Sequence, residues 1–295
     1  MTGIIIKALS RFYYVEADGN IYDCVARGSF RKSGVSPLVG DFVEFELTDG
    51  NSGVINKIEP RKNFINRPPV ANIDKLFIVS SFTSPPPNTS VIDKMTVMAE
   101  KNNIESIIVF NKCDMGDFSD FEKIYRNAGF KSYTVSAQNG LGLDALRTEL
   151  KNCTSAFTGN SGVGKSSLLN AIFGKNFIST GEVSEKLGRG RHTTRHTELY
   201  PLEFGGFVAD TPGFSSLELD TTDYSLKENL PLYFRDFEKF TDNCRFTSCT
   251  HTKESGCAVI EAVENGGIEK SRHNTYLELF EEMKDLKPWQ AKKGK

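Results

Sequence analysis

The chain has 295 residues, of which 38% are hydrophobic and 25% are charged, and its formal net charge is −2. This length is sufficient for two or three domains, and the balanced charge excludes a uniformly basic nucleic-acid-binding protein. No apolar run reaches the roughly 20 residues that span a bilayer, and the start lacks the pattern of a signal peptide. We therefore expect a cytoplasmic protein that makes no membrane contact.

Residues 1–66 read as five short strands, IIIKAL, FYYVEA, NIYDCVA, DFVEFEL and GVINKIE, with Asp-Gly-Asn turns at 18–20 and 49–51. Five short strands without a helical pattern predict a small closed β-barrel. An OB-type barrel fits the strand count, and an SH3-like barrel fits as well. The sequence Asn-Arg-Pro-Pro at 66–69 then predicts a linker to the next domain.

Residues 67–220 alternate between strands and helices. Buried strands are predicted at 73–81, 104–110, 132–137 and 154–158, and helices near 90–102, 119–128 and 141–151. In the first of these helices, Ile92, Met95 and Met98 recur at helical spacing. Such alternation implies an α/β domain in which helices cover both faces of a parallel sheet. Ligands are then expected at the carboxyl ends of the strands.

Residues 159–167, GNSGVGKSS, match the phosphate-binding pattern G-x-x-x-x-G-K-S between a predicted strand and a predicted helix. The glycines let the backbone curl around phosphate oxygens, and the following helix directs its positive end at the same anions. We expect Lys165 to reach the β- and γ-phosphates and the Ser166 hydroxyl to ligate Mg²⁺. The expected nucleotide contacts of this loop are Gly159, Asn160, Ser161, Gly162, Val163, Gly164, Lys165, Ser166 and Ser167.

The motif NKCD at 111–114 lies at the end of a predicted strand and resembles the guanine reader of GTPases. The Asp114 carboxylate can accept two hydrogen bonds from guanine, whereas adenine would leave it unpaired, and such sites reject the wrong partner by factors of about 10⁴. Asn111 is expected to meet the other edge of the base, and the aliphatic part of Lys112 to cover its face. Ser136 and Ala137 resemble the second base-contacting element, whose backbone N–H meets the guanine O6.

Two further segments resemble the nucleotide-sensing switches of GTPases. DTPG at 210–213 follows an apolar run, so that Asp210 can bind the Mg²⁺ shell through water and the Gly213 N–H can reach the γ-phosphate. In GRGRHTTRH at 188–196, Thr193 or Thr194 can close on the Mg²⁺ when the γ-phosphate is present. Segments of this kind order with triphosphate and loosen after hydrolysis.

The residue after DTPG is Phe214, at the position where Ras-type enzymes carry the glutamine that orients the attacking water. Phenylalanine cannot orient water, so we expect slow intrinsic hydrolysis, on the order of 10⁻⁴ s⁻¹, with a partner or another residue completing the site. His192 is a candidate for this step. The catalytic residues are thus expected to be Lys165, Ser166, His192, Thr193, Thr194, Asp210 and Gly213.

The order of these elements differs from that of an ordinary GTPase, in which the phosphate loop comes first and the guanine reader last. Here NKCD and Ser-Ala precede the phosphate loop, and HTTR and DTPG follow it. A circular permutation explains this order without changing the folded site, because permutation is tolerated where chain ends lie close together. The chain after DTPG then runs directly into residues 221–295, so we expect movement at DTPG to reach this last region.

Residues 221–295 are expected to be helical and polar, and too poor in apolar residues to fold alone. They contain the pattern Cys244-x₄-Cys249-x-His251-x₅-Cys257. Three thiolates and one imidazole fit a closed, tetrahedral structural zinc site. Because the chain has no export signal, a metal is a better interpretation than disulfides, and the metal would contribute to folding directly.

The barrel, the permuted GTPase motifs and the Cys/His cluster together resemble the RsgA family of ribosome small-subunit-dependent GTPases over essentially the whole chain. The resemblance is carried by GNSGVGKSSLLNAI, LGRGRHTTRHTEL, ADTPGFSSLEL, the Cys/His cluster, FRKSGVSPLVGD and NRPPVANID. It implies an OB-fold N-terminal domain at 1–66, a GTPase domain at 67–220 and a zinc-binding domain at 221–295. It also implies a cytoplasmic monomer with one structural Zn²⁺. Its expected activity is hydrolysis of GTP to GDP, stimulated by the 30S ribosomal subunit, with contact to 16S rRNA late in subunit maturation.

The residues of the barrel give modest independent support for RNA binding, since OB-type barrels commonly bind nucleic acids. Basic residues interleave with aromatic ones here, namely Lys7, Arg11, Arg27, Arg31, Lys32, Arg61, Lys62 and Arg67 with Phe12, Tyr13, Tyr14 and Phe30. Two other functions remain open: an ATP-using phosphotransferase in which NKCD is accidental, and an RNA-binding adaptor for which GTP is only a structural ligand. Competition between ATP and GTP tests the first, and turnover with and without 30S subunits tests the second.

Overall fold

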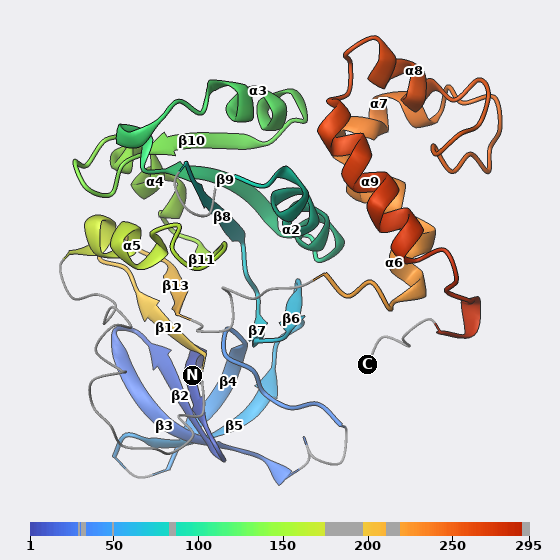
Figure 1. Cartoon of the computed structure of the whole chain (residues 1–295). Coiled ribbons are helices and arrows are strands. Elements are labelled where there is room, and N and C mark those ends of the chain that lie inside the picture. Colours follow the sequence, from blue (N-terminus) through green and yellow to red (C-terminus); the bar gives the residue numbers. More distant parts are fainter. Residues whose placement is uncertain are drawn as a thin grey trace, which may run out of the picture.

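The computed structural model describes residues 1–28, 30, 34–48, 50–82, 87–174, 197–210 and 219–290, apart from the side chains at 210 and 290. Figure 1 shows a β-barrel at the N-terminal end, a central sheet flanked by helices, and a C-terminal helical unit formed by residues 219–290. Within the described residues, every helix is too short or too polar to cross a bilayer.

The barrel is built from β1 (Thr2–Leu9), β2 (Phe12–Ala17), β3 (Asn20–Ala26), β4 (Phe42–Leu47) and β5 (Ser52–Ile58). The strands follow the order β1-β2-β3-β5-β4, and β1 closes the barrel by pairing with β4. Strands β3 and β5 are parallel, whereas the other neighbours within the barrel are antiparallel. This is the arrangement of an OB-type barrel, which decides between the two barrel types that the sequence left open.

The interior of the barrel is apolar because alternate residues of each strand point inward. The buried side chains come from all five strands: Ile5, Val15, Cys24, Val43, Phe45 and Ile55. Strand β1 has a second neighbour outside the barrel, because Lys7 pairs with Glu198 of β12 (Glu198–Pro201) in the central sheet. The Lys7 ammonium lies 2.8 Å from the Glu198 carboxylate. Barrel and central sheet are thereby joined at one edge.

The linker predicted at 66–69 is wrong, because this stretch is the turn of a hairpin between β6 (Phe64–Asn66) and β7 (Pro69–Ala71). The hairpin is held against the barrel: the Ala71 N–H donates to the Val39 carbonyl, and the Asn72 amide donates to the Gly40 carbonyl at 2.9 Å. Prolines and turn residues occur in hairpin turns as well as in linkers. The connection from the barrel to the central sheet is therefore hydrogen-bonded along its length.

The central sheet has the order β10 (Lys131–Val135), β9 (Glu105–Asn111), β8 (Lys75–Ser81), β11 (Thr154–Thr158), β13 (Phe207–Asp210) and β12. The first five strands are parallel and β12 is antiparallel. Helices α2 (Thr89–Lys101) and α3 (Ser119–Asn127) pack on one face, and α4 (Leu143–Leu150) and α5 (Lys165–Phe173) on the other. The predicted parallel sheet with helices on both faces is confirmed.

The C-terminal helical unit contains α6 (Tyr224–Asn229), α7 (Glu238–Thr241), α8 (Ala258–Glu264) and α9 (Lys270–Glu282), with 3₁₀ turns η3 (Leu230–Tyr233), η4 (Arg235–Phe237) and η5 (Pro288–Gln290). This region was expected to be too poor in apolar residues to fold alone, and it nevertheless contains a buried core. Its buried core includes Leu226, Leu230, Phe234, Phe237, Val259, Tyr276, Leu279 and Met283. Aromatic residues supply much of this core, because each buries a large apolar area.

Candidate functional site

Asn111, the last residue of β9, joins three loops at the carboxyl end of the central sheet. The residue is only 1% exposed. The Oδ1 atom accepts a hydrogen bond from the Ala137 N–H at 3.1 Å, and the Nδ2 atom donates to the Val163 carbonyl at 3.0 Å. The predicted base-reading loops and the phosphate loop are thus brought together, although they are separated by up to about fifty residues in sequence.

The other residues of NKCD are placed by the same loops. Lys112 adopts a left-handed backbone conformation, with φ of 66°, and its ammonium donates to the Gly162 carbonyl at 2.8 Å. The Asp114 carboxylate is exposed and accepts a hydrogen bond from the Ser136 hydroxyl at 2.5 Å. The Lys112 side chain therefore runs toward the phosphate loop, and Ser136 positions the carboxylate that is expected to read the base.

Sequence reasoning missed that Asn111 and Ser136 bind the protein itself. Asn111 was expected to meet the base, and the Ala137 N–H to meet the guanine O6, yet these two groups bond each other. No residue pattern in the sequence indicates this, because the partner of Asn111 lies on a loop 26 residues further along the chain. The side-chain amide suits this role, since it can donate to one loop and accept from another.

Two glycines of the phosphate loop have no room for a side chain. Gly159 has φ of 140°, and a Cβ atom there would lie 2.1 Å from the Val79 carbonyl oxygen of β8. Gly164 has φ of 91°, and its Cβ would lie 2.5 Å from the Asn111 Nδ2 atom. The loop can therefore pass this close to β8 and Asn111 only with glycine at both positions.

Lys165 is the first residue of α5, and its side chain folds back over the phosphate loop. Its ammonium donates to the carbonyls of Gly159 at 2.6 Å and of Asn160 at 2.9 Å. Burial lowers the pKa of Lys165 from its usual value to about 8. A cation that is partly desolvated in this way gains strongly from an anion beside it.

The remaining residues of the loop differ in what they can offer a ligand. Asn160, Ser161 and Ser167 are exposed, and Ser166 is half-buried in the first turn of α5. Val163 is buried, and its side chain packs into the core beneath α4 and α5, so only its backbone can face a nucleotide. A loop of backbone N–H groups at the start of a helix is a general anion-binding arrangement.

The predicted switch residues mostly lie outside the described residues: His192, Thr193, Thr194, Gly213 and Phe214. Of Asp210 only the backbone is described. It ends β13, which is parallel to β11 and pairs with it directly, so Asp210 lies at the same edge of the sheet as the phosphate loop.

The four predicted metal ligands come together in the C-terminal helical unit. The ligand atoms of Cys244, Cys249, His251 and Cys257 all lie within 4.8 Å of one another. The Cys244 and Cys257 sulfurs are 3.9 Å apart, and the His251 Nδ1 atom lies 3.6 Å and 3.4 Å from them. Ligands about 2.3 Å from a tetrahedral ion lie roughly 3.7 Å from each other, so this geometry fits such an ion.

The loop that holds the cluster is braced by α9. His273 bonds the carbonyl of His251 at 2.8 Å through its Nε2 atom, and the Tyr276 hydroxyl donates to the Thr250 carbonyl at 2.6 Å. Burial raises the pKa of the Cys249 thiol to about 12 and lowers the pKa of His251. A neutral imidazole is ready to bind a metal, whereas the thiols must lose protons to do so.

Known protein families match most of the chain. The family model described as RsgA GTPase matches residues 58–220, and the model described as RsgA N-terminal domain matches residues 2–55. A relative from Caldanaerobacter subterraneus subsp. tengcongensis, named small ribosomal subunit biogenesis GTPase RsgA, is 48% identical over 96% of each chain. One of the same name from Alkaliphilus metalliredigens is 44% identical over 96% of this chain and 97% of its own.

Two solved structures share the fold and the chain order. YjeQ from Thermotoga maritima is 36% identical with a TM-score of 0.81, covering 97% of this chain and 99% of that one. YloQ, described as a circularly permuted GTPase, is 37% identical with a TM-score of 0.81, covering 97% and 96%. These likenesses agree with the order of the loops in the sequence and with their convergence on Asn111. The chain therefore belongs to the RsgA family of circularly permuted GTPases.

Proposed function

We propose that this GTPase acts as a late-stage maturation factor of the 30S ribosomal subunit and that the subunit stimulates its hydrolysis of GTP. The family membership and the names of its relatives, which place them in small ribosomal subunit biogenesis, support this role. The observation that carries the enzymatic part is the hydrogen bond between Asn111 and Val163, because it holds the base-reading loop against the phosphate loop.

The exposed carboxylate of Asp114 would read the guanine edge, held in position by the Ser136 hydroxyl. The aliphatic chain of Lys112 crosses between the two loops and would cover one face of the base. An adenine base would bury this carboxylate without donors opposite it, which costs binding energy. GTP and GDP are therefore the proposed ligands.

The phosphates would occupy the cradle of backbone N–H groups between Gly159 and Ser167. Lys165 would exchange the Gly159 and Asn160 carbonyls for phosphate oxygens, which offer a full negative charge. Ser166 would supply a hydroxyl ligand to Mg²⁺, and Asp210 at the end of β13 would bind its water shell. A bound Mg²⁺ neutralises charge on the β- and γ-phosphates.

Gly213, Thr193 and Thr194 are proposed to sense the γ-phosphate, and His192 to assist the attacking water. Because Phe214 cannot orient water, the intrinsic rate should be low, and the ribosomal subunit would complete or order the site. The Cys₃His cluster is proposed to hold one structural Zn²⁺, because four protein ligands leave no open coordination position for catalysis.

Contact with 16S rRNA is proposed for the outer face of the barrel. Phe12 is 42% exposed and pairs across the sheet with Val25, which is 37% exposed, and the Arg11 guanidinium lies over the Phe12 ring. Exposed aromatic and basic side chains on an OB barrel suit stacked bases and phosphates. Other basic residues of the barrel serve the fold instead, since Lys7, Arg61 and Lys62 pair with Glu198, Asp41 and Asp74.

We place the domain boundaries at 1–66, 67–220 and 221–295, and we propose that the protein works as a cytoplasmic monomer. The first boundary falls within the β6–β7 hairpin, so the barrel and the GTPase domain would move together. The OB barrel and the C-terminal helical unit both pack on the GTPase domain, which allows one chain to present an RNA-binding face and a nucleotide site to the same subunit.

The proposed function is tested by GTP turnover at increasing concentrations of purified 30S subunits. We expect slow turnover alone and a rise that saturates with 30S, and ATP should neither be hydrolysed nor compete. Lys165→Ala is the control, because it removes the phosphate contact and should abolish turnover under both conditions. GTP turnover that is indifferent to 30S would contradict the proposed role, and preference for ATP would contradict the assignment of the base.

A further inference from the structure

Helix α2 is buried on both sides, which its sequence pattern did not predict. Ile92, Met95 and Met98 pack in the core that covers the central sheet, whereas Val97 belongs to the core of the C-terminal helical unit. Figure 1 shows α2 between the sheet and α9. A helix enclosed in this way cannot shift against one neighbour without disturbing the other, because protein cores are closely packed.

The first turns of α2 lie against the phosphate loop. Val91, Ile92 and Met95 line a small cavity of about 20 Å³ together with the loop residues Gly159 and Val163. The Met95 sulfur also lies 4.0 Å from the hydroxyl of Thr158, the residue that precedes the loop. Only one layer of side chains therefore separates the phosphate loop from α2, so a change in the shape of the loop would act on α2 directly.

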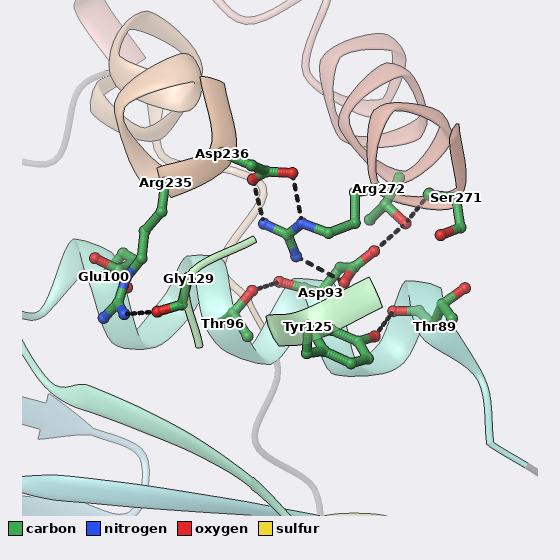
Figure 2. A network of polar contacts seen from close by, with 11 residues as sticks. Thr89, Asp93, Thr96, Glu100, Tyr125, Gly129, Arg235, Asp236, Ser271 and Arg272 are labelled. Atoms are coloured by element: carbon green, nitrogen blue, oxygen red, sulfur yellow. Dashed lines mark hydrogen bonds and ion pairs between the residues drawn. The ribbon is translucent and has the colours of Figure 1, made fainter. Parts of the chain in front are cut away.

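The opposite side of α2 is held by a buried ion-pair triad, which Figure 2 shows from close by. Arg272 of α9 is fully buried and donates to Asp93 of α2 at 2.8 Å. Its other two bonds go to Asp236 of η4 at 2.9 Å and 2.8 Å. The Thr275 hydroxyl of α9 donates to the second oxygen of Asp93 at 2.9 Å. Two buried bonds thus fix the Asp93 side chain of α2 to α9, and two more hold Arg272 to η4.

Further polar contacts continue this attachment along the helix. Three residues of α2 make polar contacts of 2.6–2.8 Å with the C-terminal helical unit: Ser90 with Glu278, Lys94 with Glu282 and Lys101 with Asp223. These three residues lie on the same face of α2 as Asp93. The Arg235 guanidinium pairs with Glu100 at 2.5 Å and donates to the Gly129 carbonyl at 3.2 Å. The C-terminal helical unit is consequently attached to the whole length of α2.

We propose that α2 transmits the nucleotide state of the phosphate loop to the C-terminal helical unit, and that the Asp93–Arg272–Asp236 triad makes α2 and this unit move as one body. The inference rests on the proposed nucleotide binding at the phosphate loop. The order of motifs in the sequence suggested that the chain segment after DTPG carries the coupling to the C-terminal region. We assign this coupling instead to packing through α2. Asp93 is thus a positioning residue: it holds α2 against the C-terminal helical unit through its contacts with α9.

The test compares hydrogen–deuterium exchange of the full-length protein with and without GDP. In the wild type, GDP should alter exchange in the phosphate loop, in α2 and in α9. Asp93→Asn keeps the size of the side chain and removes its charge, so the response of α9 should fall several-fold while the response of the phosphate loop persists. Glu149→Gln is the matched control, because it breaks a half-buried pair with Lys75 on the opposite face of the sheet.

Three results would overturn the inference or separate it from the proposed function. An α9 response in Asp93→Asn equal to that of the wild type would overturn it, and so would a wild-type α9 that ignores GDP while the phosphate loop responds. If Asp93→Asn does not fold, Asp236→Asn decides in its place, since it removes the charge of the other carboxylate in the triad. A phosphate loop that ignores GDP would instead contradict nucleotide binding itself.

Discussion

Replacing Asn111 by alanine tests whether this side chain holds the nucleotide site together. The substitution removes the acceptor of the Ala137 N–H and the donor to the Val163 carbonyl. Losing a hydrogen bond costs about 0.5–1.5 kcal/mol, and leaving a buried partner unsatisfied costs about 1–3 kcal/mol. The Ala137 N–H is partly exposed and can find water, whereas the Val163 carbonyl is buried, so the free energy of unfolding should fall by roughly 2–4 kcal/mol.

A loss of this size should be visible in two assays. The melting temperature of the nucleotide-free protein should fall by roughly 5–10 °C. Because the two loops are no longer aligned before binding, the Kd for GDP should rise roughly 10- to 100-fold. Differential scanning fluorimetry and titration with a fluorescent GDP analogue measure the two quantities.

The matched control for Asn111→Ala is Ser106→Ala on the same strand, β9. The Ser106 hydroxyl is buried, and within the described part of the chain it has no hydrogen-bond partner. Removing it should leave both melting temperature and GDP affinity near the wild-type values, since no bond is broken. If Asn111→Ala behaved like this control, the reasoning that Asn111 braces the loops would be refuted.

Three further predictions concern other parts of the two sites. Because burial lowers the pKa of Lys165 to about 8, the free protein loses this positive charge as the pH rises through 8. The Kd for GDP should therefore increase between about pH 7 and about pH 9. A Kd that does not change with pH would contradict this, whereas the Kd of the Lys165→Arg variant should not change with pH. Cys257→Ser should reduce the bound zinc from one ion to none, as measured by native mass spectrometry. Hydrogen exchange in α8 and α9 should become faster, while the affinity for GDP should not change. A variant that keeps the ion would contradict the proposed ligand set. Gly159→Ala should abolish GDP binding, because its Cβ atom would clash with the Val79 carbonyl. Gly174→Ala should bind GDP in the same titration, because a Cβ atom there has no neighbour within 4 Å. Equal binding by both variants would show that the close contact at Gly159 is unimportant.

The sequence was sufficient for four of the six strands of the central sheet and for the identity of the loops around Asn111, because strand and loop patterns are local. The buried strand Thr154–Thr158, the glycine positions of the phosphate loop and the Cys/His spacing all follow from neighbouring residues. The strand pattern left the barrel type open, since strand count does not determine strand order, although the resemblance to the RsgA family implied an OB fold. It is the long-range pairing of β1 with β4 that identifies the OB arrangement.

The errors arose where a local pattern has two structural meanings. Turn residues at 66–69 fit both a linker and a hairpin, and only the pairing of β6 with β7 and the bonds of residues 71 and 72 distinguish them. The α2 sequence shows one apolar face at helical spacing, and this pattern gives no sign that Asp93 is buried against a second neighbour. Its partner Arg272 lies 179 residues away, and no property of either residue alone predicts that they meet.

The most direct test of the central claim is the base preference of Asp114→Asn. Asparagine can donate a hydrogen bond where aspartate only accepts, and xanthine carries an oxygen where guanine carries its 2-amino group, so the pairing with Asp114 should be exchanged. Competition binding should show that the variant loses affinity for GDP and gains affinity for xanthosine diphosphate, with no gain for ADP. Unchanged preference for GDP would mean that the loop after β9 does not read the base, and the account of the nucleotide site would fail.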